Sequence, residues 1–104
     1  MNVTISSNKL NKQYDDLSDY FGEIKAHAIK KRINEMIDAS SLHVISLIPQ
    51  AELHPLRSNR AGQMAVTTSG KYRMIFKPTG DYELSDYKTI TEVEILDFDT
   101  DYHR

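Results

Sequence analysis

The chain has 104 residues, of which 39% are hydrophobic and 27% charged, and this composition predicts one folded domain over residues 1–104 rather than a disordered segment. It contains no cysteine, which excludes disulfides, thiolate metal sites and a cysteine nucleophile. The net charge of −2 is unevenly distributed, because residues 53–80 hold five basic residues and no Asp or Glu. Such a segment is either a solvated strand surface or a surface for an anionic partner, most simply phosphate.

The N-terminal residues lack the apolar stretch of a signal peptide, and the longest apolar run, near 44–48, is interrupted by Ser46. We therefore expect a cytoplasmic protein that does not enter a membrane.

The first half predicts a strand and two helices. Residues 2–6 alternate as a short strand does, and Ser7 or Asn8 can cap a helix that ends near Tyr14. A polar turn is expected over 15–19. A longer helix is expected over 20–39, with an apolar stripe formed by Ile24, Ala28, Ile29, Ile33, Met36 and Ile37. The basic residues of this helix are expected on its solvated side: Lys25, Lys30, Lys31 and Arg32.

The second half changes to the period of strands. Ser40 and Ser41 end the long helix or cap a short turn through Leu47, and Pro49 blocks any continuation. Alternation predicts strands over 63–68 and 71–77 joined by a turn at Ser69-Gly70, and a last strand over 90–98 after a polar connector. This order of strands and helices predicts an α+β domain in which the N-terminal helices pack on one face of an antiparallel sheet.

The spacing of the Asp and His residues does not indicate a metal site. Asp97, Asp99 and Asp101 resemble the start of a calcium loop, but Tyr102 stands where that loop needs glycine. The four histidines do not pair at metal-ligand spacing. No metal or cofactor is expected.

Three kinds of side chain in the chain suit cleavage of RNA without a metal. Two histidines, His54 and His103, can divide the proton transfers, because the pKa of imidazole lies near working pH. Arg73 can stabilise the negative charge of a phosphorane, and Tyr102 can stack on a base or assist proton transfer. The alternative is that these histidines are ordinary surface residues.

Several segments, taken in order, resemble the HigB branch of the RelE/ParE toxin superfamily. They are Leu53-His54-Pro55-Leu56-Arg57-Ser58-Asn59-Arg60-Ala61-Gly62-Gln63, then Gly70-Lys71-Tyr72-Arg73-Met74-Ile75-Phe76, then Val93-Glu94-Ile95-Leu96 and Asp101-Tyr102-His103. The N-terminal half also fits in outline, with Lys9-Leu10-Asn11-Lys12 in the first helix and Asp38-Ala39-Ser40-Ser41-Leu42 at the end of the second, so the resemblance spans nearly the whole chain. It implies a RelE-like, microbial-ribonuclease-type fold and ribosome-dependent cleavage of mRNA, which stops growth when the protein is free.

The resemblance also implies partners and site residues. The partners are a HigA-like helix-turn-helix antitoxin, the ribosome and mRNA, with operator DNA bound only through the toxin–antitoxin complex. The implied catalytic residues are His54, Arg73, Asp101, Tyr102 and His103. The basic residues expected to contact RNA are Arg57, Arg60, Lys71 and Lys77.

Two features depart from the family pattern. The chain is acidic overall, so its acidic region, 81–101, must lie away from RNA or be masked. The segment before Asp101-Tyr102-His103 is also about one residue longer than the family run, so the terminal triplet could instead be Asp97-Phe98-Asp99. We favour 101–103, because all three residue types are present there, and this register needs a β-bulge near Asp99.

Two other functions fit the same resemblance. One is a ParE-like toxin that inhibits DNA gyrase without being an enzyme, since one fold can host both activities. The other is a degenerate member that only binds its antitoxin.

Overall fold

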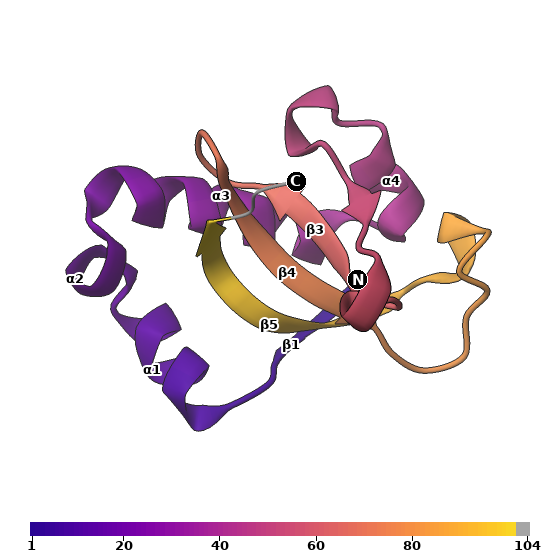
Figure 1. The fold of residues 1–104 in the computed structure, drawn as a ribbon, viewed down its shortest axis with the longest axis horizontal. Coiled ribbons are helices and arrows are strands. Elements are labelled where there is room, and N and C mark those ends of the chain that lie inside the picture. Colours follow the sequence, from indigo (N-terminus) through magenta and orange to yellow (C-terminus); the bar gives the residue numbers. More distant parts are fainter. Residues whose placement is uncertain (102–104) are drawn as a thin grey trace.

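A computed structural model describes residues 1–101 of the chain. Its helices are α1 (Asn8–Asp15), α2 (Leu17–Phe21), α3 (Glu23–Asp38) and α4 (Leu42–Ser46), with 3₁₀ turns η1 (Pro49–Ala51), η2 (Ser58–Arg60) and η3 (Tyr87–Thr89). Its strands are β1 (Asn2–Ile5), β2 (His54–Pro55), β3 (Met64–Thr67), β4 (Tyr72–Pro78) and β5 (Glu92–Asp101). They form one five-stranded sheet in the order β1-β5-β4-β3-β2, which confirms the predicted α+β class (Figure 1).

The sheet is mixed rather than wholly antiparallel. Strands β2 to β5 pair antiparallel in the order β2-β3-β4-β5, as the hairpin signals predict. Strand β1 pairs parallel with β5, from Asn2 opposite Glu92 to Ile5 opposite Ile95. Alternation in a strand defines its buried face but neither its neighbour nor its direction, so the sequence could not show this pairing.

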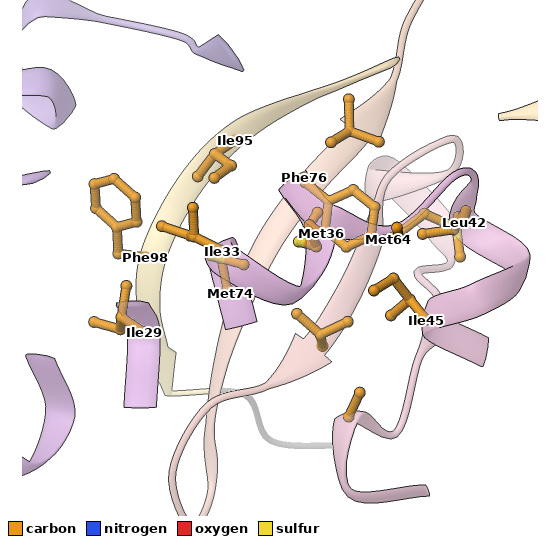
Figure 2. Close-up of a cluster of buried hydrophobic side chains, with 14 of the residues drawn as sticks. Ile29, Ile33, Met36, Leu42, Ile45, Met64, Met74, Phe76, Ile95 and Phe98 are labelled. Atoms are coloured by element: carbon orange, nitrogen blue, oxygen red, sulfur yellow. The ribbon is translucent and has the colours of Figure 1, made fainter. Parts of the chain in front are cut away.

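One face of the sheet is buried under the helices. Figure 2 shows Ile29, Ile33 and Met36 of α3 lying among side chains of β3, β4 and β5. In Figure 1, α3 passes behind β3 and β4. Alternation places Met64, Val66, Met74 and Phe76 in this core. The opposite face carries a smaller cluster, in which Leu56, Ala65 and Ile75 pack with Leu96.

The helical region differs from its prediction in two places. Helix α2 begins at Leu17, inside the turn predicted over 15–19, and Leu17 is buried in the core. The helix predicted over 20–39 is divided at Gly22, whose φ of 82° interrupts it, so α3 begins at Glu23. The buried stripe of α3 is Ala26, Ile29, Arg32, Ile33 and Met36, and Arg32 is only 6% exposed. Ile24 and Ile37, which were expected in the stripe, are 84% and 48% exposed. Arg32 is therefore a buried residue and not part of the predicted solvated face.

Strand β5 is longer than predicted and contains two register shifts. It runs from Glu92 to Asp101, and its pairing with β4 shifts between Ile75 and Phe76 and again between Arg73 and Ile75. The second shift falls between Asp97 and Thr100 of β5, which confirms the bulge expected near Asp99.

Within residues 1–101, no helix has the length and apolar character that crossing a membrane requires.

Phe98 links β5 to the first two helices. Its buried ring stacks on Tyr14 of α1, with centroids 6.0 Å apart, and meets Phe21 of α2 edge-on at 6.5 Å. We expect Phe98→Ala to lower the free energy of unfolding by about 3–5 kcal/mol, because it leaves a cavity between the layers. Urea unfolding followed by circular dichroism measures this loss. The control is Tyr20→Ala at an exposed ring; an equal loss there would contradict the role of Phe98.

Candidate active site

The sheet register brings His54 and Arg73 to the face that the helices leave uncovered, which we call the open face. His54 pairs with Ala65, and Ala65 pairs with Ile75, so these three side chains share one face. Arg73 lies two residues before Ile75 on β4, so its side chain points to the same face of the sheet. The strands β2 and β4 are two strand spacings apart, and Arg73 is displaced by two residues along β4. The Cα atoms of His54 and Arg73 are therefore about 12 Å apart, so both side chains can reach a group that lies between them.

His54 is half-buried on the short edge strand β2, which the sequence did not predict. Its Nδ1 lies 2.8 Å from the backbone carbonyl oxygen of Glu52. Because a carbonyl only accepts, Nδ1 carries the proton and donates it to this hydrogen bond. In the neutral ring, Nε2 is then the basic nitrogen, which is the form that a general base requires.

Arg73 is fixed at one end by the hairpin between β3 and β4. Its Nη1 donates to the carbonyl oxygens of Gly70 and Tyr72, at 3.0 and 3.1 Å. Its Nε is buried and has no hydrogen-bond partner among the described residues. A buried donor without a partner is costly, and a phosphate oxygen would satisfy it while pairing with a side chain that is always charged.

Three residues near this pair were not predicted from sequence: Glu52, Thr67 and Arg32. Thr67 is the cross-strand partner of Arg73, and its hydroxyl donates to Oε1 of Glu52 at 2.8 Å. Arg32 of α3 donates from Nε to the backbone carbonyl oxygen of Thr67 at 2.8 Å. The only signal in the sequence is that Glu52 lies two residues before His54, the spacing of side chains on one face of an extended segment.

The terminal triplet is only partly described. Asp101 pairs with Tyr72, which alternates with Arg73, so Asp101 lies on the helix side of the sheet. One of its carboxylate oxygens is 3.3 Å from Nζ of Lys71. The structure therefore does not bring Asp101 together with His54 and Arg73. Tyr102 and His103 lie outside the described residues.

The residues of the alternative triplet Asp97-Phe98-Asp99 form contacts that stabilise the fold. Phe98 is in the core, and Asp97 accepts hydrogen bonds from the Asp99 amide at 3.3 Å and the Thr100 hydroxyl at 2.6 Å, which hold the bulge in place. Asp99 binds Nζ of Lys25 on α3 at 3.0 Å. All three residues of the alternative triplet thus have structural contacts, and the choice of the register that ends in Asp101-Tyr102-His103 stays a prediction.

The predicted basic residues divide into two kinds. Arg57, just before η2, and Arg60, in η2, are exposed, and neither forms an ion pair within the described part of the chain. Lys71 and Lys77 pair with Asp101 at 3.3 Å and with Glu94 at 3.4 Å. These acidic residues of β5 are thus partly masked by lysines, and such exposed pairs are weak enough for a polyanion to compete with them.

Lys25 joins α3 to the end of β5. Its Nζ contacts Asp99 and lies 3.4 Å from the centroid of the Tyr72 ring. The hydrogen bond to Asp99 is the main reason that the pKa of Lys25 is raised above its ordinary value of 10.5. Its contribution to stability is therefore complete below pH 10.5 and disappears as the pH rises through the raised pKa.

We expect Lys25→Met to lower the urea midpoint of unfolding at pH 7, because it leaves the nearly buried Asp99 carboxylate without its cation. The matched control is Lys30→Met on the same helix, at an exposed position that forms no ion pair with another described residue. Equal midpoints for the two variants would show that the Lys25–Asp99 pair does not stabilise the fold.

Several solved structures are similar to this chain. No protein-family model matches the sequence, and no curated protein matches it. The YoeB/ParE toxin from Agrobacterium tumefaciens superposes with a TM-score of 0.64 at 12% identity, covering 98% of this chain and 100% of the toxin. The YoeB-YefM complex and the YoeB dimer from Staphylococcus aureus give TM-scores of 0.60 and 0.55 at 13% and 15% identity, each covering 100% of this chain and 98% of the other.

These similarities define the class of fold. The chain has the fold of the YoeB/ParE toxins over essentially its whole length. This confirms the predicted RelE-like architecture, whereas the assignment to the HigB branch stays a prediction.

Proposed function

We propose that this protein is the toxin of a type II toxin–antitoxin system and cleaves mRNA on the ribosome. The observation that carries the proposal is that His54 and Arg73 share the open face of a sheet with the YoeB/ParE fold. The protein would act in the cytoplasm, where mRNA and ribosomes are found, and needs no metal for the chemistry below.

The chemistry follows from these two side chains. Nε2 of His54 takes the proton of a ribose 2′-OH as that oxygen attacks the adjacent phosphorus. Arg73 stabilises the negative charge of the pentacoordinate phosphorane. The bond to the 5′ oxygen then breaks and this oxygen receives a proton, for which His103 is the proposed donor and Tyr102 and Asp101 its proposed helpers. The products are a 2′,3′-cyclic phosphate and a 5′-hydroxyl end.

An antitoxin is the proposed partner of the free toxin. A toxin of the same fold is known in a YoeB-YefM complex, which supports such a partner here. From the sequence resemblance we propose a HigA-like helix-turn-helix antitoxin, which would carry the toxin to operator DNA in a shared complex. An adjacent reading frame for a small helix-turn-helix protein would support this pairing.

The direct test is to map mRNA ends after the protein is induced in bacteria. We expect codon-related cuts and growth arrest, and His54→Ala or Arg73→Ala should reduce cleavage by about two to four orders of magnitude. The control is His27→Ala, at an exposed histidine of α3 on the helix side. Unchanged cleavage by both site variants would refute the assignment.

A second test concerns the exposed arginines. We expect Arg57→Ala and Arg60→Ala to raise KM, and each lost phosphate contact to reduce the slope of log affinity against log salt by about 0.7. Lys31→Ala on α3 is the control for a general change in charge. An unchanged salt dependence in both arginine variants would remove these residues from the RNA-binding surface.

Gyrase inhibition is the second candidate, because one structural neighbour is described as a YoeB/ParE toxin and ParE-like toxins are the alternative from sequence. Loss of supercoiling by purified gyrase, with mRNA intact, would favour it. Failure to stop growth without the antitoxin would instead favour a member that only binds its partner.

A further inference from the structure

We propose that Arg32, Thr67 and Glu52 form a positioning relay that holds His54 in one tautomer and one orientation. This inference rests on the proposed function only for its catalytic consequence, because His54 transfers a proton only if the protein cleaves RNA. None of its three members was predicted from the sequence, and none needs to touch RNA.

The link to His54 is the backbone of Glu52. Its carbonyl oxygen receives the Nδ1 proton of His54 over 2.8 Å. Glu52 is not glycine, yet its φ of 47° and ψ of 45° place it in the left-handed region. Side chains disfavour this conformation, so it persists only where surrounding contacts hold it, and such positions cluster at functional sites.

The contact that holds Glu52 comes from strand β3. Oε1 of Glu52 accepts a hydrogen bond from the Thr67 hydroxyl at 2.8 Å, across 15 residues of chain. Thr67 is buried, and it stands opposite Arg73 in the sheet. Together with the pairing of His54 with Ala65, this hydrogen bond ties the segment that carries His54 to the strand beside Arg73, so the two site residues share a support.

Thr67 is itself held from the helix layer. Nε of the buried Arg32 donates to the Thr67 carbonyl oxygen at 2.8 Å, and Nη1 of Arg32 pairs with Glu35 at 2.7 Å. Arg32 thus holds the backbone of Thr67 from the core side, while the Thr67 hydroxyl binds Glu52 on the open face. This also explains why a guanidinium is buried in α3, where the sequence predicts a solvated position.

The experiment reads the tautomer of His54 directly, from the ¹⁵N chemical shifts of its ring in the full-length protein, and measures kcat and KM of mRNA cleavage in parallel. His54→Gln identifies the ring signals by their loss. We expect Thr67→Val and Glu52→Ala to mix the two tautomers and to lower kcat about ten- to a hundredfold, with KM little changed. Thr67→Ser and Glu52→Gln keep a donor and an acceptor, so both should behave like the native protein.

Thr68→Val is the matched control. Its hydroxyl donates to the Tyr72 carbonyl oxygen at 3.3 Å, one residue away and outside the relay, so its removal should leave the His54 signals unchanged. A folded Thr67→Val protein that keeps the Nδ1–H tautomer would overturn the relay. If Thr67→Val does not fold, Glu52→Ala at an exposed position decides the question in the same way. Absence of RNA cleavage by the native protein would refute the proposed function, while the ring signals would still decide the relay.

Discussion

The site depends on the burial of the sheet by helices on one face only. Met74 and Phe76 of β4 lie in the helix-covered core, so the alternation of the strand forces Arg73 to the opposite face. The same constraint acts on β3, where Met64 and Val66 face the helices and Thr67 faces Arg73's side. The hydrophobic effect thus orients the polar side chains of the open face, and local hydrogen bonds then fix their exact positions.

Features set by local patterns could be predicted from the sequence. The hairpin around Gly70 follows from alternation and a turn residue, and the amide of Leu10 binds the side chain of Ser7 as expected for a helix cap. Features set by distant partners could not. The parallel pairing of β1, the short strand at His54 and the burial of Arg32 each depend on residues far away in the chain.

The acidic C-terminal region is compatible with an RNA-binding face because much of its charge has structural partners. Asp99 binds Lys25 on the helix side, Glu94 binds Lys77, and Asp97 holds the bulge through the Thr100 hydroxyl. Net charge alone suggested a poor fit to RNA. The arrangement of the charges matters more, because it leaves Arg57 and Arg60 exposed and Arg73 on the open face.

The most direct measurement of whether the open face meets RNA is photo-crosslinking in a translating extract. A photoreactive side chain would replace Lys77, exposed on the open face, or Lys30, which lines a groove between α3 and the first two helices on the other side of the molecule. The His54→Ala background keeps the mRNA intact. One-sided burial predicts that mRNA is crosslinked from position 77 and not from position 30. Crosslinks from position 30, with none from position 77, would contradict it.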